Sequence, residues 1–203
     1  MTDRLVEADQ GIATFGVRRH FAREVAERTP LGCAVEGVVK ANGWIPDELV
    51  ALAVRQELDR GHLGGSFILE GMPGNRRQAE LLDDVLTEVG LPLHAAVHVD
   101  TPEALCVERA ARRLVCQVCD GGSHQVVTSA HGRCRRCGTR PTRRTTDAPE
   151  PFAKRLAQHA QVGPDLLGYY RYDRLIELSG LATSAELARE CRHLLAPRIG
   201  ASV

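Results

Sequence analysis

The amino-acid sequence predicts an α/β fold, in which helices flank a parallel sheet and a small cysteine-containing segment is inserted. Helical and strand patterns alternate along most of the chain, which is typical of parallel sheets. The 203 residues are enough for one domain with its own core and a small insert. Between residues 116 and 142 four cysteines appear with few large apolar residues, so this segment needs something other than a core to hold it.

Helices are predicted where apolar residues recur every three or four positions. Proline in the first helical turn marks two of the starts, at Pro46 and Pro102. The expected helical segments are 1–28 with a loop near Gly11 and Gly16, 33–40, 46–61, 76–89, 103–113, 151–170 and 185–195.

Strands are predicted where short apolar runs lie between turn residues. Residues 66–70 read Ser-Phe-Ile-Leu-Glu and run into Gly71, and residues 95–99 form a second such run. Residues 174–179 form the last one. The order of these strands and the helices between them indicates parallel pairing.

The charge balance and the hydropathy of the chain narrow the possible partners. The 26 basic and 26 acidic residues cancel, so no overall field favours nucleic acid. No apolar run is long enough to span a membrane, and the N-terminus lacks the apolar region of a signal peptide. We therefore expect a cytoplasmic monomer that does not associate with membranes.

Two Cys-x2-Cys pairs, Cys116 with Cys119 and Cys134 with Cys137, indicate a metal site. Each pair can bind one metal ion through a tight turn, and together they supply four thiolates in a tetrahedron. Four thiolates leave no open coordination position, so we expect a structural Zn²⁺. The alternative is free thiols or two disulfides.

Arginines cluster in and just after this cysteine segment. Guanidinium groups bind phosphate oxygens in a bidentate manner, so the cluster predicts contact with the phosphates of a nucleotide or of nucleic acid. A solvated basic loop is the alternative. The arginines are Arg133, Arg135, Arg136, Arg140, Arg143 and Arg144.

Several segments, in order along the chain, resemble motifs of the bacterial adenylate kinases. Residues 29–32 (TPLG) and 42–48 (NGWIPDE) are similar to that family's TPLG and GELVPDE. Residues 67–73 (FILEGMP) and 164–170 (PDLLGYY) are similar to FLLDGFP and PLIGYY. The cysteine pairs resemble the zinc site in the lid of many members, and the resemblance covers roughly residues 11–195.

This resemblance implies a P-loop-kinase-like fold and transfer of a phosphoryl group from ATP, with Mg²⁺, to a nucleoside monophosphate. Residues 108–113 are similar to the (D/E)RxxGRR motif at the lid entry, and Arg144 and Arg155 match the R-x-D-D and KRL motifs after the lid. Catalytic phosphate contacts are thereby implied for Arg109, Arg113, Arg144 and Arg155. Nucleotide contacts are implied for Ile45, Glu70, Gly71 and Gln78, with Gln78 recognising the base of AMP and Glu70 near Mg²⁺.

The implied domains are a core with the monophosphate-site helices at 1–113, a zinc-binding lid at 114–146 and the C-terminal part of the core at 147–203.

The sequence departs from the family pattern at residues that the family uses for phosphoryl transfer. The chain holds no G-x4-G-K-[ST] loop, and its only lysines, Lys40 and Lys154, do not follow glycines. By alignment the chain starts where that loop would have ended, so we expect the first, central strand to be absent and the other strands to close up or stay exposed.

The monophosphate side departs as well. The family's ISTGD falls on residues 15–19 (FGVRR), and its next arginine falls on Ala22, with Arg23 one place off. The arginine of GFPR falls on Gly74, with Arg76 and Arg77 nearby. Phosphoryl transfer depends on positioning and charge neutralisation, so these losses predict an impaired rate.

Two functions therefore remain open. The first is a nucleoside monophosphate kinase, which needs either an upstream phosphate loop hidden by a mis-assigned start or a substitute for it. The second is a non-catalytic protein of the same fold that binds a nucleotide or a partner and keeps the structural zinc. Binding of nucleic acid by the arginine-rich segment is a third, and it predicts salt-dependent affinity.

Overall fold

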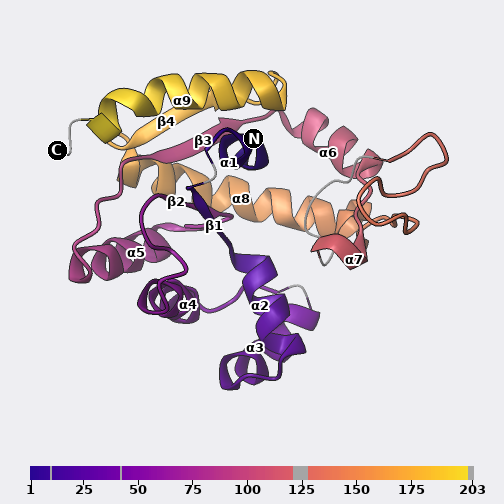
Figure 1. The fold of residues 1–203 in the computed structure, drawn as a ribbon, viewed down its shortest axis with the longest axis horizontal. Helices are drawn as coiled ribbons and strands as arrows, with labels where there is room; N and C mark the ends of the chain where they lie inside the picture. Colours follow the sequence, from indigo (N-terminus) through magenta and orange to yellow (C-terminus); the bar gives the residue numbers. More distant parts are fainter. Residues whose placement is uncertain (10, 42, 121–127, 201–203) are drawn as a thin grey trace. The chain divides into compact units, whose positions relative to one another are not determined.

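The computed structural model of the chain describes residues 1–9, 11–41, 43–120 and 128–200. Contacts divide the chain into two compact units, whose residues can be located by the colour bar of Figure 1. Unit 1 comprises residues 1–17, 46–102 and 160–203, and unit 2 comprises residues 18–45 and 103–159. The expected lid at 114–146 falls inside unit 2, and the three-part division made from the sequence stays a prediction.

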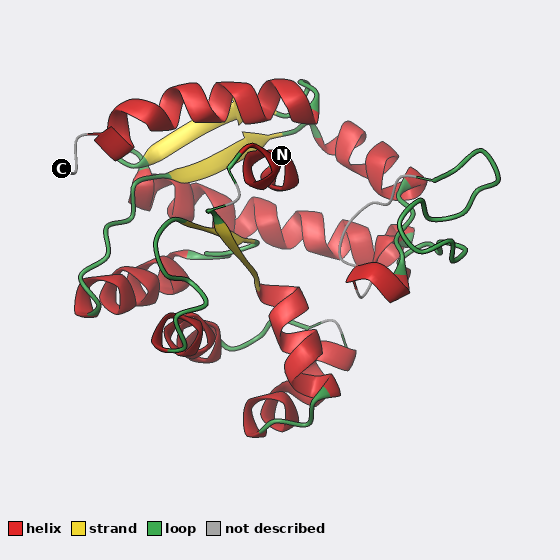
Figure 2. Cartoon of the chain, in the orientation of Figure 1, coloured by secondary structure: helices red, strands yellow, loops and turns green. Residues whose placement is uncertain are grey.

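The strands found among the described residues belong to unit 1 and form two parallel pairs (Figure 2). Strand β1 (Ala13–Gly16) pairs with β2 (Phe67–Glu70), and β3 (Ala96–Asp100) pairs with β4 (Leu175–Ser179). No strand of the described ranges joins β2 to β3. The predicted parallel α/β architecture is confirmed, and its strands lie in two pairs rather than in one continuous sheet.

An apolar cluster in unit 1 connects both strand pairs. Its buried members come from α1 (Thr2–Ala8), β4 and α9 (Ser184–Gly200). Val97 and Val99 of β3 and Ile68 of β2 pack against it. The two pairs therefore share a core although no backbone hydrogen bonds link them in the part of the chain described.

Helices α4 (Asp47–Asp59) and α5 (Arg76–Glu88) pack on each other in unit 1. Each buries residues spaced four apart, Val50 with Val54 and Leu82 with Leu86, so one face of each helix is apolar. This pairing agrees with the helices predicted at 46–61 and 76–89.

Residues 13–16 contradict the prediction of a helix over 1–28. They form β1, because the backbone N–H of Ala13 donates to Ser66 O at 2.9 Å and the strand continues in register with β2. Phe15 is 4% exposed in this strand. Pairing with a distant segment outweighs local helix propensity here, and this is a contact that periodicity in a short window does not reveal.

Unit 2 begins with two short helices, α2 (Val17–Ala26) and α3 (Pro30–Lys40). Thr29 caps α3 by accepting from Gly32 N at 3.0 Å, with Pro30 in the first turn. Gly32 lies against the backbone of Glu24 in α2, where an added Cβ would be 2.0 Å from the carbonyl oxygen. The close contact of the two helices therefore depends on the missing side chain at Gly32.

The rest of unit 2 contains α6 (Glu103–Arg112), the short α7 (Gln117–Asp120), the 3-10 turn η1 (Thr145–Asp147) and the start of α8 (Pro149–Tyr170). Val115 and Thr142 exchange two backbone hydrogen bonds of 2.9 and 3.0 Å, which close the cysteine segment at its base. Among the helices described, none has the length and apolar character required to cross a membrane.

Candidate functional site

Three cysteines from the two Cys-x2-Cys pairs converge in unit 2. The Sγ atoms of Cys116, Cys134 and Cys137 all lie within 4.8 Å of one another, and those of Cys116 and Cys137 are 3.4 Å apart. Cys116 and Cys134 are buried and Cys137 is exposed. The fourth predicted ligand, Cys119, belongs to α7, and its side chain lies outside the described residues.

The local backbone explains why the sulfurs converge. Gly138 N donates to Cys134 O at 2.8 Å and Cys134 N donates to Thr139 O at 2.9 Å, so residues 134–139 form a tight turn. Gly138 has a φ of +74°, which glycine adopts without strain. Tetrahedral zinc with bonds of about 2.3 Å would separate its sulfurs by roughly 3.8 Å, so the three thiols fit such an ion.

Asp147 connects two of the predicted catalytic arginines. Arg113 donates to it through Nε at 2.7 Å and Nη2 at 2.5 Å, and Arg155 donates through Nη2 at 3.3 Å. The carboxylate side chain is only 3% exposed. Burial raises the pKa of Asp147, but the hydrogen bonds and charge of Arg113, the hydrogen bond of Arg155 and the charge of Arg144 outweigh it and lower the pKa overall.

The other two predicted catalytic arginines lie differently. Arg144 is half-buried, and its charge acts on both Asp147 and Arg18. Arg109 is exposed on α6. The structure thus gathers Arg113, Arg144 and Arg155 around one carboxylate and leaves Arg109 towards solvent.

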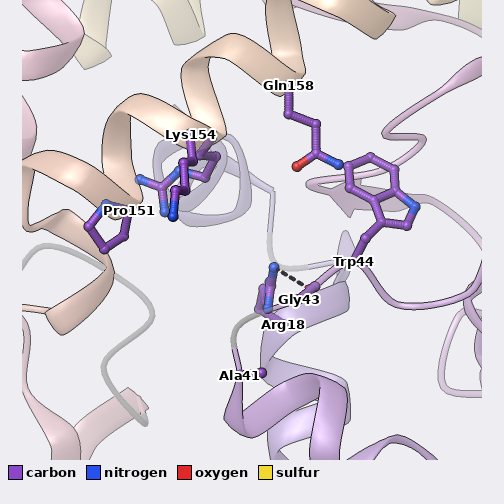
Figure 3. A pocket seen from close by; sticks show the side chains of 8 residues that line it. Arg18, Ala41, Gly43, Trp44, Pro151, Lys154 and Gln158 are labelled. Carbon is purple, nitrogen blue, oxygen red and sulfur yellow. Dashed lines mark hydrogen bonds between the residues drawn. The ribbon is translucent and has the colours of Figure 1, made fainter.

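A cavity of about 280 Å³ opens in unit 2 beside this cluster (Figure 3). Lys154 and Gln158 reach it from α8, and Arg18 and Trp44 reach it from the segment containing α2 and α3. Its remaining lining residues are Ala41, Gly43, Pro151 and Arg155. Three cationic side chains, one aromatic ring and one amide therefore face a space large enough for part of a small ligand.

Gln78, predicted to recognise a base, is 6% exposed in unit 1. Its Oε1 accepts from Gly74 N at 2.7 Å, and its Nε2 donates to Asp47 Oδ1 at 2.8 Å. Asn75, the N-cap of α5, also donates to Asp47, at 3.0 and 3.2 Å. In this structure the Gln78 amide fixes the loop after β2 to the start of α4, and base recognition by Gln78 stays a prediction.

The remaining nucleotide-site residues fall in both units. Glu70 ends β2 and Gly71 follows it with a φ of +72°, at the carboxyl edge of a parallel strand pair where ligands commonly bind. Ile45 is 5% exposed in unit 2. Their contacts with a nucleotide stay predictions.

The two lysines occupy helices rather than a glycine-rich loop. Lys40, in the last turn of α3, lies 2.7 Å from Glu36, and Lys154, on α8, lies 3.0 Å from Glu150. Both pairs are exposed and separated by four positions on their helices, so solvent screens them. Neither lysine is placed as a phosphate-loop lysine would be.

Sequence reasoning missed Asp147 as the partner of two arginines and Arg18 as a cavity residue. Asp147 carried a usable signal, since it lies three residues after Arg144, where the R-x-D-D motif has its second aspartate. Arg18 carried none, because it falls at a glycine of the family motif.

Comparison with known proteins gives one consistent result. A sequence model described as adenylate kinase matches residues 10–175. The chain is 34% identical over 175 residues to an adenylate kinase of Symbiobacterium thermophilum, covering 85% of this chain and 81% of that protein. It is 31% identical over 188 residues to one of Thermodesulfovibrio yellowstonii (91% and 86%) and 30% identical over 184 residues to one of Anaeromyxobacter dehalogenans (89% and 86%).

Proposed function

Because the chain belongs to the adenylate kinase family, we propose that it is a nucleoside monophosphate kinase, which transfers the γ-phosphoryl group of ATP to a monophosphate. The observation that supports this most directly is the cluster of Arg113, Arg144 and Arg155 around Asp147, next to a cation-lined cavity. Such a cluster suits an anionic ligand with several oxygens.

The reaction places particular demands on these residues. An oxygen of the acceptor phosphate forms a bond to the γ-phosphorus of ATP while the bond from that phosphorus to its bridging oxygen breaks, giving ADP and a nucleoside diphosphate. Negative charge spreads over the phosphoryl oxygens, and fixed guanidinium groups neutralise it. Asp147 would keep Arg113 and Arg155 oriented, so that these side chains lose less conformational entropy when the nucleotides bind.

The proposed nucleotide contacts outside the arginine cluster are the backbone at Ile45 and Gly71, the carboxylate of Glu70 and the amide of Gln78. Mg²⁺ bound with ATP would offset the negative charge of the phosphates. Arg109 is proposed as a further phosphate contact from α6.

We propose that Cys116, Cys119, Cys134 and Cys137 hold a structural Zn²⁺. The convergence of three of the sulfurs within 4.8 Å supports this. The cysteine segment has too few apolar residues to form a core, and bound zinc would supply the missing stability.

We propose a reduced phosphoryl-transfer rate for the chain as it stands. The absence of G-x4-G-K-[ST] from the sequence and the helical positions of both lysines support this. The same observations favour a second function, in which the fold binds a nucleotide or a partner without catalysis.

Coupled ATP-to-ADP turnover with AMP, GMP, CMP and UMP separates these functions. It should be run on the zinc-loaded chain, on Arg155→Gln, and on a chain extended by any upstream in-frame residues. We expect slow turnover by the chain that falls at least about tenfold in Arg155→Gln, since a charge-assisted hydrogen bond is lost.

Turnover that appears only in the extended chain would assign the kinase activity to the longer protein. Turnover by none of the proteins, with zinc bound and far-ultraviolet circular dichroism unchanged, would reject the kinase and leave the binding protein.

A further inference from the structure

Arg18 departs from the pattern that the sequence led us to expect on the monophosphate side. The family's arginine in this region falls on Ala22, and Arg18 falls where the family has glycine. In the structure Arg18, near the start of α2, lines the cavity of unit 2 together with Arg155 and Lys154 (Figure 3). The positive side chain that the family motif has at position 22 is thus absent there, and one is present at position 18.

The surroundings of Arg18 are those of an anion site. Its Nη2 donates to Gly43 O at 3.1 Å, and within the described ranges it has no carboxylate partner. Solvent reaches Arg18, yet neighbouring protein atoms remove part of its hydration, and this desolvation lowers its pKa. The like charges of Arg155 and Arg144 lower that pKa further.

The other cations at the cavity are partly compensated. Arg155 shares Asp147 with Arg113, and Lys154 pairs with Glu150 on its own helix. Arg18 therefore contributes the excess positive charge of the cavity. The hydrogen bond to Gly43 fixes its guanidinium while leaving other N–H groups available to a ligand.

The opposite part of the cavity suits a planar group. Trp44 is 38% exposed and lines the cavity with Gln158, whose amide can both donate and accept hydrogen bonds (Figure 3). Exposed aromatic rings beside cationic groups are suited to ligands that combine a flat ring with phosphate.

We propose that Arg18 is a phosphate-binding residue, which with Arg155 and Lys154 binds the phosphate of a nucleoside monophosphate whose base lies against Trp44. The identity of the ligand rests on the proposed function. The role of Arg18 replaces that of the family-motif arginine that falls on Ala22.

Direct binding tests this without any turnover. The zinc-loaded full chain is titrated with AMP, GMP, CMP and UMP by calorimetry, and with the matching nucleosides and inorganic phosphate. Trp44 is the only tryptophan of the chain, so its fluorescence reports whether the ligand occupies this cavity. We expect at least one monophosphate to bind and change Trp44 emission, and its nucleoside to bind at least about tenfold more weakly.

Three variants give the decisive comparison. Arg18→Gln should raise the dissociation constant of the monophosphate by about 10- to 100-fold, since it removes a charge-assisted hydrogen bond. Arg18→Lys keeps the charge but loses the planar fork, so its effect should be smaller. Arg112→Gln removes one positive charge from an exposed pair with Glu108 elsewhere in unit 2 and should leave the constant unchanged.

Equal weakening by Arg18→Gln and Arg112→Gln would show a non-specific effect of charge and overturn the proposal. Binding that leaves Trp44 emission unchanged, or no binding of any monophosphate at millimolar concentration, would also overturn it. Turnover with an unchanged KM in Arg18→Gln would reject the role of Arg18 and keep the kinase. Arg18-dependent binding without turnover would reject the kinase and keep the site.

Discussion

Buried side chains differ in kind between unit 1 and the cysteine segment of unit 2. In unit 1 they are mostly aliphatic and come from strands and helices that are distant in sequence. In residues 114–146 the described buried residues are Val115, Cys116, Cys134 and Pro141. The apolar area of unit 1 can stabilise it through the hydrophobic effect, whereas the cysteine segment needs ligand bonds or ion pairs to offset its loss of conformational entropy.

Removing a thiol should have the largest effect and should be confined to unit 2. We expect Cys134→Ser to abolish zinc binding and hydrogen-exchange protection at Val115 and Thr142, since structural zinc contributes about 10 kcal/mol or more in small sites. Elemental analysis and exchange mass spectrometry measure both. Cys33→Ser is the control, because Cys33 is exposed outside the cluster. Full protection in metal-free wild-type protein would contradict this expectation.

A substitution that creates a cavity in the apolar core should destabilise unit 1. Leu82, on α5, is 1% exposed, and Leu82→Ala should lower the free energy of unfolding by about 2–5 kcal/mol. Urea denaturation measures this loss, and zinc content should be unchanged. Leu52→Ala on α4 serves as the control, since Leu52 is 44% exposed. A comparable loss in both variants would mean that burial does not decide stability in this unit.

Breaking the ion pairs of Asp147 should lower stability less than Cys134→Ser or Leu82→Ala does. Asp147→Asn should lower the free energy of unfolding by about 1–3 kcal/mol, because Arg113 and Arg155 lose a charged acceptor but are 27% and 30% exposed and partly screened by water. Glu150→Gln is the control, since Glu150 is 81% exposed in its pair with Lys154. Thermal unfolding of the two variants, measured in parallel, shows whether Asp147→Asn loses more stability than Glu150→Gln.

The same carboxylate gives a pH dependence with a definite sign. The pKa of Asp147 is lowered in the folded state, so its contribution is fully present above the ordinary pKa of about 3.9 and is lost as pH falls through the folded value. Wild-type protein should therefore lose stability below about pH 4 more steeply than Asp147→Asn. Parallel acid titrations monitored by circular dichroism would refute this if the two slopes were equal.

Local sequence patterns predicted most helices and three strands, because they depend on periodicity and on capping residues such as Thr29 and Pro46. Strand β1 was missed because residues 13–16 become a strand only by pairing with β2. From the sequence we expected strands that close up or stay exposed, and their separation into two parallel pairs was not predicted, because pairing joins segments far apart in the chain.

The candidate site was predictable where residues act through their own local spacing, as the cysteine pairs do. The position of Arg18 in a cavity with Arg155 was not predictable, because it depends on the tertiary arrangement that brings the start of α2 and residues 41–44 to the same cavity as α8 within unit 2. The Gln78 network was likewise hidden, since Asp47 and Gln78 are brought together by the packing of α4 on α5.

The contact between Gly32 and the backbone of Glu24 has a consequence for how this sequence can vary during evolution. A Cβ atom at position 32 would overlap a carbonyl group that has no room to move within α2, so even alanine is excluded unless the two helices separate. Neighbouring exposed positions of α3 can accept many residues, whereas position 32 accepts one. Saturation mutagenesis at this codon under selection for folding should therefore recover glycine alone.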